Sequence, residues 1–244
     1  AGEVIFDNVA FQFDDADKPV LQNINLKVKK GATVAVLGKT GAGKSTLAYL
    51  LTRLYDPTSG RILIDGQDIT DIARSHIRQN VATVLQEPFL FSKSIISNIR
   101  IANPNASEEE VYKAARIADI HDNILSFKQG YETPVGEKGV TLSGGQRQRL
   151  AIARTIINKA PILIFDDSLS AVDTETDINI RTALKKRSEE TTTFIITHRI
   201  ATAKDADLIV VLENGTISEQ GTHEQLIKKK GLYQRVYEIQ TKLE

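Results

Sequence analysis

The 244-residue chain contains no cysteine, no methionine and no tryptophan. Without cysteine it has no disulfide framework, no thiolate metal site and no thiol nucleophile, which fits a reducing compartment. The sequence does not open with an initiator methionine or a signal peptide. We therefore expect the chain to be a piece of a longer polypeptide.

A net charge is also lacking, because 31 lysine and arginine residues balance 31 aspartate and glutamate residues. Binding to a nucleic-acid backbone depends on an excess of basic residues, so the composition argues against nucleic acid as the main partner. The longest apolar runs, such as 208–212, are far shorter than the roughly 20 residues that a membrane-spanning helix needs. Any phosphate group that the chain binds must be held by a local structure.

Hydrophobic residues make up 41% of the chain, enough for a substantial core, and strand-like and helix-like patterns alternate along it. The first 30 residues favour antiparallel strands at 3–6, 10–13 and 24–28. Nearly continuous apolar or threonine runs, typical of strands covered on both faces, follow at 33–37, 162–165 and 193–196. We expect these three runs to lie side by side in a parallel core sheet.

Helical patterns interrupt this arrangement. Ser107 and Glu110 have the spacing of a capping box ahead of an amphipathic helix, within an inserted and mostly helical lobe at about 88–158. The tail favours two charged helices separated at 228–231, where basic residues followed by glycine indicate a helix stop rather than a lipid-binding patch. The pattern predicts one α/β unit with an insertion.

One segment matches the pattern G-x-x-x-x-G-K-[ST] of a phosphate-binding loop. Its residues are Gly38, Lys39, Thr40, Gly41, Ala42, Gly43, Lys44, Ser45 and Thr46. The glycines let successive backbone N–H groups and the following helix N-terminus point at phosphate oxygens, while Lys44 supplies charge and Ser45 a hydroxyl for Mg²⁺. The alternative is a glycine-rich turn that binds nothing. The expected strand before the loop and the helical leucine pattern after it, at Leu47, Leu50, Leu51 and Leu54, favour nucleotide binding.

Two carboxylates, Asp166 and Asp167, end the expected buried strand 162–165. A strand end beside the phosphate loop is where such folds place an aspartate that organises Mg²⁺. We expect Asp166 on the metal side and Asp167 to reach the attacking water. The alternative is a pair of solvated turn residues.

A second glycine motif, Leu-Ser-Gly-Gly-Gln at 142–146, precedes a long helical pattern. Ser143 and Gln146 have the spacing of a capping box, so the motif has a purely structural interpretation as a helix start. Gly144 and Gly145, however, are poor helix formers that each cost about 1 kcal/mol relative to alanine. Close approach of a ligand to bare backbone N–H groups explains the two glycines better.

In order and spacing, these motifs, together with Ser-Ala-Val-Asp at 170–173 and Thr-His-Arg at 197–199, resemble the nucleotide-binding domain of ABC transporters. The resemblance covers essentially the whole chain. It implies an α/β fold of the P-loop NTPase (RecA-like) class, in which a parallel core sheet carries an N-terminal antiparallel β subdomain and an inserted α-helical subdomain. It also implies that the chain binds ATP and Mg²⁺.

The resemblance assigns further roles. Gln86 is similar to the Q-loop residue that links Mg²⁺ to the membrane domain, 170–173 resembles the D-loop, and His198 resembles the switch histidine that contacts the γ-phosphate. Phe13 matches the aromatic residue that stacks on adenine, where the family more often has tyrosine. From the residues alone, Phe13 is interpreted as strand core and His198 as an ordinary hydrogen-bonded histidine.

Two segments resemble the exporter branch of the family. Residues 86–92 resemble the segment after the Q-loop that receives a coupling helix of the membrane domain, and 133–139 resemble the X-loop, with Glu137 at its characteristic glutamate. The alternative for Phe89 and Phe91 is burial within the helical lobe.

By this resemblance the chain is the motor domain of an exporter of drugs, lipids or peptides, at the cytoplasmic face of the cell membrane. Its partners would be a transmembrane domain of the same chain and a second nucleotide-binding domain. Two such domains close head to tail on ATP, with 143–146 of one facing the γ-phosphate that Lys44 of the other holds. A soluble ABC-type ATPase of DNA repair or translation is the alternative, and an ABC importer subunit is a third.

The chain departs from the family at Asp167, because the usual catalytic residue there is glutamate. One methylene fewer withdraws the carboxylate by about 1.5 Å, and a misplacement of about 1 Å costs on the order of a hundredfold in rate. We therefore expect tight ATP binding and slow hydrolysis, as in the degenerate half of a heterodimeric exporter. His198, which such halves often replace, is retained, so a homodimer with modest activity is the alternative.

Overall fold

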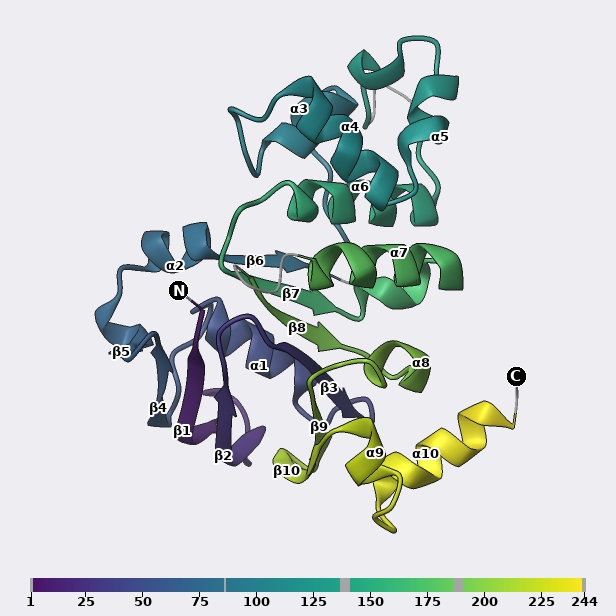
Figure 1. Ribbon diagram of the computed structural model, residues 1–244. Coiled ribbons are helices and arrows are strands. Elements are labelled where there is room, and N and C mark those ends of the chain that lie inside the picture. Colours follow the sequence, from purple (N-terminus) through teal and green to yellow (C-terminus); the bar gives the residue numbers. More distant parts are fainter. Residues whose placement is uncertain (1, 86, 137–140, 187–190, 243–244) are drawn as a thin grey trace. The chain divides into compact units, whose positions relative to one another are not determined.

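The structure is a computed structural model that describes residues 2–85, 87–136, 141–186 and 191–242. Contacts between residues divide the chain into two compact units (Figure 1). Unit 1 comprises Ala1–Ala82, Ala160–Asp166 and Lys186–Glu244. Unit 2 comprises Thr83–Lys159 and Asp167–Lys185. The helical lobe expected at about 88–158 lies within the first segment of unit 2.

Unit 1 holds the sheets. Its elements are β1 (Val4–Phe11), β2 (Leu21–Val28), β3 (Thr33–Gly38), α1 (Lys44–Leu51), β4 (Ser59–Ile64), β5 (Gln67–Asp68), α2 (Arg74–Asn80), β7 (Ile162–Asp166), β8 (Thr192–Ile196), α8 (Ile200–Ala203), β9 (Leu208–Glu213), β10 (Thr216–Gly221), α9 (His223–Leu226) and α10 (Leu232–Thr241). Strand β6 (Val81–Val84) crosses the boundary between the units. Among the described residues, no helix is both long and apolar enough to span a membrane.

The N-terminal sheet has the strand order β2-β1-β4-β5, and all its pairs are antiparallel. The two separate strands expected at 3–6 and 10–13 are wrong, because β1 is a single strand whose register shifts around Asn8. Asn8 has a φ of 51°, and its N–H donates to the Asn25 side chain at 2.9 Å. A bulge thus interrupts the apolar alternation without ending the strand.

The core sheet has the strand order β10-β9-β3-β8-β7-β6. Strand β8 pairs in parallel with β3 on one side and β7 on the other, which confirms the expected parallel core. Val34 and Val36 of β3 face a hydrophobic cluster with α1 and the N-terminal sheet, so α1 is enclosed between the two sheets (Figure 1). Ala35 and Leu37 face the opposite cluster with α8 and α10. Burial on both faces explains the continuous apolar pattern.

Unit 2 is mostly helical. Its helices are α3 (Ile95–Arg100), α4 (Glu108–Ile117), α5 (His121–Ser126), α6 (Gly144–Ile156) and α7 (Thr174–Lys185). The capping box expected at the start of α4 is confirmed, because Ser107 and Glu110 exchange both side chain-to-backbone bonds. Helix α7 joins this unit because it packs against α4.

Helix α1 is shorter than its leucine pattern suggests. It ends at Leu51, and Arg53 has a φ of 51°, so the chain has already left the helix before Leu54. Leu50 is fully buried in the core cluster, whereas Leu54 is 53% exposed. Two leucines of the same apparent stripe thus differ completely in burial.

This difference predicts unequal effects on stability. Replacing Leu50→Ala should lower the free energy of unfolding by about 2–5 kcal/mol, because it removes transfer free energy and leaves a cavity. The matched control Leu54→Ala should change it by about 0.5 kcal/mol or less. Urea unfolding of the 244-residue chain measures both, and equal losses would contradict the boundary of α1.

Candidate functional site

The phosphate loop connects β3 to α1, in the context that the sequence predicts. Gly43 precedes the first residue of α1 with a φ of 98°, and a Cβ there would meet Leu21 Cδ2 at 2.6 Å. Glycine is therefore required at position 43 both by the backbone conformation and by packing. Thr40 and Gly41 are exposed on the loop, while Thr46 is buried in α1.

The Lys44 side chain folds back over its own loop. Its Nζ atom donates to the carbonyl oxygens of Gly38 at 2.7 Å and Lys39 at 2.9 Å. These bonds keep the ammonium group at the mouth of the loop, beside the N-terminus of α1. A helix N-terminus carries partial positive charge and unpaired N–H groups, so both features favour an anion at this point.

Ser45 and Asp166 supply oxygen atoms at the same place. The Ser45 hydroxyl donates to Asp166 Oδ1 at 3.1 Å, which joins the start of α1 to the end of β7. Mg²⁺ in nucleotide sites uses one or two protein oxygens and takes its other ligands from phosphate and water. This pair fits that requirement. Gln86, the third expected metal-side residue, lies outside the described residues.

His198 follows β8, which pairs directly with β3. The Thr197 N–H donates to the Val36 carbonyl at 3.1 Å, and the Thr197 hydroxyl accepts from the Arg199 N–H at 3.1 Å. The His198 side chain is exposed, and it lines a cavity of about 240 Å³ together with Gly38 and Lys39. Unit 1 therefore brings together the phosphate loop, Asp166 and the segment that holds His198.

Phe13 lies beyond the end of β1, among aromatic rings. Its ring packs edge-on against Phe11, with centroids 4.8 Å apart, and against Tyr55, with centroids 5.3 Å apart. Phe13 is half-buried and packs against the core cluster, but it lies outside the strand, so the interpretation as strand core fits only its packing. Tyr55 was missed by the sequence analysis, since nothing in the pattern links positions 42 residues apart.

Asp167 has a left-handed backbone conformation. Its φ is 48° and its ψ is 14°, immediately before a 3₁₀ turn at Ser168–Ala171. Aspartate and asparagine tolerate this region better than residues with longer side chains. The local backbone thus suits the short carboxylate at the position where the family resemblance implies glutamate.

The second glycine motif begins α6, and its capping box is confirmed. The Ser143 N–H donates to Gln146 Oε1 at 2.9 Å, and the Gln146 N–H donates to Ser143 Oγ at 3.2 Å. A Cβ on Gly144 would meet only the end of Arg147, 3.9 Å away, and one on Gly145 would meet nothing within 4 Å. Neither glycine has a positive φ. No contact within the described chain requires glycine at these two positions.

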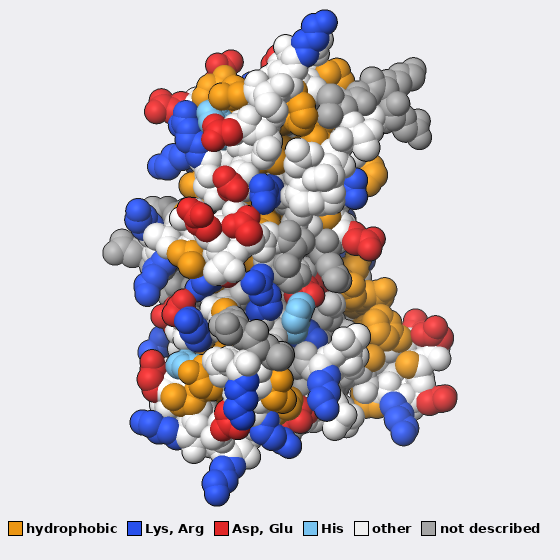
Figure 2. Space-filling view, turned by 90° about the vertical axis from the view of Figure 1, so that its right-hand side faces the viewer, with side chains coloured by type: hydrophobic (Ala, Val, Ile, Leu, Met, Phe, Trp, Pro, Cys, Tyr) orange, Lys and Arg blue, Asp and Glu red, His pale blue; other side chains and the backbone are white. Residues whose placement is uncertain are grey.

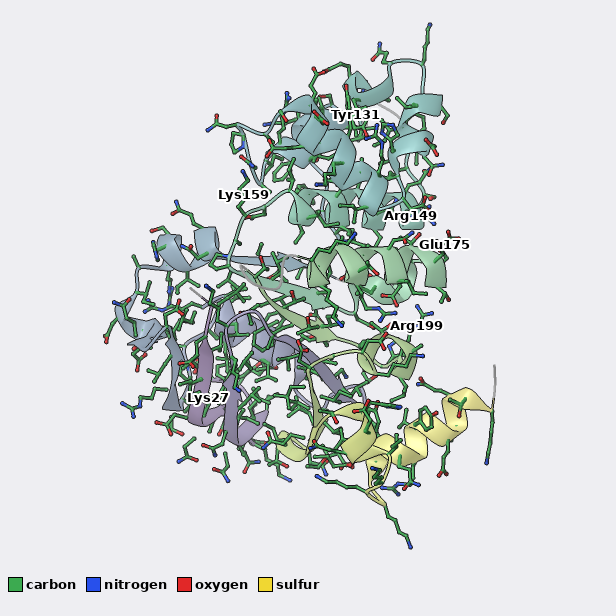
Figure 3. All side chains as sticks on the ribbon, in the orientation of Figure 1. Lys27, Tyr131, Arg149, Lys159, Glu175 and Arg199 are labelled. Atoms are coloured by element: carbon green, nitrogen blue, oxygen red, sulfur yellow. The ribbon has the colours of Figure 1, made fainter. Side chains whose placement is uncertain are left out.

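Asp173, at the end of the expected D-loop, is tied to α6. Its Oδ2 atom forms an ion pair with Arg149 at 3.0 Å, and its Oδ1 atom accepts from the Thr176 N–H at 2.9 Å. The bond from the Thr176 backbone lowers the pKa of the Asp173 carboxyl below its ordinary value, so the group is ionised near neutral pH. Figure 3 labels Arg149 on α6.

Phe89 and Phe91 form an exposed aromatic pair. Their rings meet edge-on with centroids 5.0 Å apart, and the two side chains are 68% and 42% exposed. The alternative, that Phe89 and Phe91 are buried within the helical lobe, is therefore wrong. Of the expected X-loop, Glu137 and the two residues after it lie outside the described residues.

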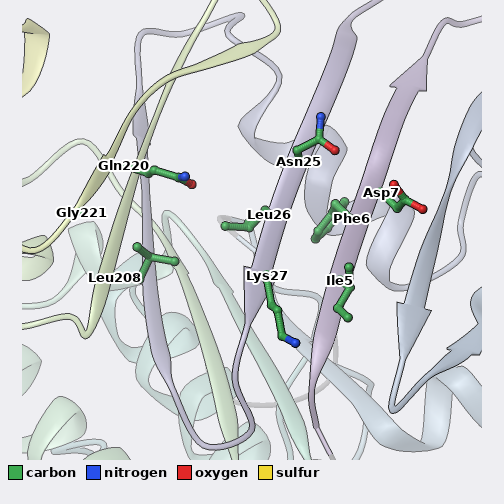
Figure 4. A pocket seen from close by; sticks show the side chains of 9 residues that line it. All are labelled: Ile5, Phe6, Asp7, Asn25, Leu26, Lys27, Leu208, Gln220 and Gly221. Atoms are coloured by element: carbon green, nitrogen blue, oxygen red, sulfur yellow. The ribbon is translucent and has the colours of Figure 1, made fainter.

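The surface has two further features. A larger groove of about 510 Å³ lies between strands β2 and β10, lined by Asn25, Lys27 and Gln220 among others, and none of its lining residues belongs to the phosphate loop (Figure 4). On the face shown in Figure 2, basic and acidic side chains are interspersed. This mixture agrees with the balanced charge of the sequence.

Comparison with known proteins gives concordant matches. The family model described as "ABC transporter" matches residues 21–170. A putative multidrug export ATP-binding/permease protein of Staphylococcus aureus is 49% identical over 98% of this chain and 41% of its own length. The Bacillus subtilis protein YgaD, described in the same words, is 48% identical with the same coverage. A solved bacterial Atm1-family ABC exporter with ATP bound superimposes with a TM-score of 0.92 at 44% identity, over 98% of this chain and 42% of that chain.

The chain thus spans about two fifths of the length of these proteins. The matched part of the chain contains the phosphate loop, the motif at 142–146 and the end of β7. Matches in sequence and in structure therefore agree with the site geometry: the chain belongs to the ABC transporter family and has the fold of that family's ATPase domain.

Proposed function

We propose that the chain is the ATP-binding and ATP-hydrolysing motor domain of an exporter of drugs, lipids or peptides. The observation that carries the proposal is the phosphate loop, where Lys44 Nζ is held over the loop and Ser45 is bonded to Asp166. The names of the relatives, which describe multidrug export, support export over DNA repair or translation.

ATP binding is the first task of this site. The backbone N–H groups of the loop and the N-terminus of α1 receive the phosphate oxygens, and Lys44 neutralises their charge. Ser45 and Asp166 would hold Mg²⁺, which supplies further electrostatic stabilisation of the phosphates when it is bound. By family resemblance, Gln86 completes this metal side and Phe13 stacks on the adenine.

Hydrolysis needs an oriented water and stabilised charge rather than covalent chemistry by the protein. We assign the carboxylate of Asp167 to orient the water and His198 to contact the γ-phosphate. Since the Asp167 carboxylate lies about one C–C bond, roughly 1.5 Å, short of the position that glutamate reaches, hydrolysis at this site is slow.

Dimer closure couples the site to transport. The start of α6, at 143–146, of one domain faces the γ-phosphate held by the other, so ATP bridges two electropositive surfaces and its hydrolysis removes the bridge. The open space above Gly144 and Gly145 supports this role. We further propose that Phe89 and Phe91 receive a coupling helix of the transmembrane domain, at the cytoplasmic face of the membrane.

Removing the Lys44 charge tests the binding site. Lys44→Ala should weaken ATP binding by about ten- to a hundredfold, because charged hydrogen bonds to phosphate are each worth about 1.5–3 kcal/mol. Titration with a fluorescent ATP analogue in the presence of Mg²⁺ measures the Kd. The control Lys39→Ala removes the same charge from an exposed side chain of the same loop and should change the Kd less than about threefold. If both variants lose affinity equally, the loop does not act through Lys44.

The Gly145→Ala variant separates the two interpretations of the motif at 142–146. A methyl group meets nothing in the chain, so stability should stay the same or rise by up to about 1 kcal/mol. The ATPase rate of the assembled exporter should nevertheless fall at least about tenfold, because the methyl group occupies the approach to the helix N–H groups. An unchanged rate would leave the motif as a helix start only.

Lengthening the carboxylate tests the catalytic assignment. Asp167→Glu should raise the ATPase rate of the assembled exporter at least about fivefold, because the longer side chain brings the carboxylate closer to the attacking water. Asp167→Asn should lower the rate. The left-handed φ at this position should cost the Glu variant on the order of 1 kcal/mol in stability, which thermal unfolding measures. An unchanged or lower rate in a folded Glu variant would contradict the positional argument.

A further inference from the structure

The C-terminal helix α10 contacts the segment that holds His198. The Gln240 side chain donates through Nε2 to the His198 carbonyl oxygen at 2.8 Å. Its Oε1 atom accepts from the Ile200 N–H at 2.8 Å. One side-chain amide therefore binds backbone groups on both sides of Arg199. This residue precedes α8 and is labelled in Figure 3.

These two bonds hold the segment on the side that faces α10, away from β3. Before His198, the Thr197 N–H ties the chain to Val36 of β3. After it, Gln240 ties both the His198 carbonyl and the start of α8 to α10. The imidazole extends from this backbone, so a shift of the His198 backbone moves the ring as well.

A cavity lies next to the segment on this side. The cavity of about 240 Å³ lies between the segment and α10, and both His198 and Gln240 line it. Its apolar lining comes from Leu37, Ile200, Val211, Leu232, Tyr233 and Val236. Ile200 and Ala203 also pack in one hydrophobic cluster with Tyr233 of α10. The Gln240 bonds are the contacts with α10 that reach the backbone of His198 itself.

Helix α10 is itself firmly docked at its other end. Tyr233 is buried, its hydroxyl is 2.7 Å from His223 Nδ1, and its backbone N–H donates to Glu219 Oε1 at 3.1 Å. Burial raises the pKa of Tyr233 to about 12, so the phenol keeps its proton at neutral pH. Gln240 comes seven residues later, about two helical turns along the same face.

We propose that Gln240 is a positioning residue for hydrolysis, which holds the backbone of His198 where the imidazole reaches the γ-phosphate. The inference rests on the proposed function of His198. A displacement of about 1 Å at a catalytic group costs on the order of a hundredfold in rate. Because the phosphate loop is held by its own bonds, Gln240 governs the rate of hydrolysis and leaves ATP binding unchanged. The docking of the C-terminal helix thereby controls turnover.

The first experiment compares two glutamines of α10 in the full-length exporter. Gln240→Ala should lower kcat by about 3- to 30-fold and change the KM for ATP by less than about twofold. Gln234→Ala is the matched control, because the Gln234 amide bonds only to Glu238 of the same helix in the described contacts, and it should keep the wild-type kcat. Equal kcat values for the two variants, or a loss of ATP affinity with Gln240→Ala, would overturn the inference.

A double mutant then tests whether Gln240 acts through His198. Adding Gln240→Ala to His198→Ala should lower kcat no further than His198→Ala alone, whereas losses that multiply would overturn the inference. If His198→Ala itself keeps the wild-type kcat, the proposed role of His198 fails and the inference falls with it. If His198→Ala is slow and Gln240→Ala is not, only the inference fails.

Gln240→Glu provides a second variant with a similar side-chain shape. It retains an acceptor for the Ile200 N–H but places a carboxylate against the His198 carbonyl, so its kcat should be as low as that of Gln240→Ala or lower. A wild-type kcat in this variant would show that donation to His198 is not required and would overturn the inference. ATP affinity within about twofold of wild type checks that both variants remain folded.

Discussion

The parallel register of three strands is the constraint on which the site depends. Strand β8 pairs with β3 and β7, so the chain leaves all three strands at the same edge of the sheet. Gly38 ends β3, Asp166 ends β7, and the segment with His198 follows β8. Helices and the second sheet cover both faces of these strands, which explains why their sequences are nearly continuously apolar.

Hydrogen bonds within unit 1 hold the polar groups of the site in place. Lys44 is bonded to loop carbonyls, Ser45 is bonded to a buried carboxylate, and the His198 backbone is held by an amide from α10. Groups fixed in this way need little reorganisation when a phosphate arrives, which is the physical basis of electrostatic preorganisation. By the same reasoning, we expect the change of one methylene at Asp167 to slow hydrolysis.

Unit 2 has two surface features that no contact within the described chain explains. The start of α6 is capped and open, and the aromatic pair Phe89 and Phe91 is exposed. An exposed aromatic pair and two glycines that no described contact requires are unfavourable for stability alone, which agrees with the proposed contacts to other domains.

The sequence by itself determined the phosphate loop, the buried strands and the helix caps, because each depends on residues close together in the chain, such as Gly43 with Lys44 or Ser143 with Gln146. The register shift at Asn8, the end of α1 before Leu54 and the bond from Gln240 to His198 were decided only by the tertiary structure. These features arise from residues far apart in sequence that meet through packing, and local periodicity contains no information about such pairs.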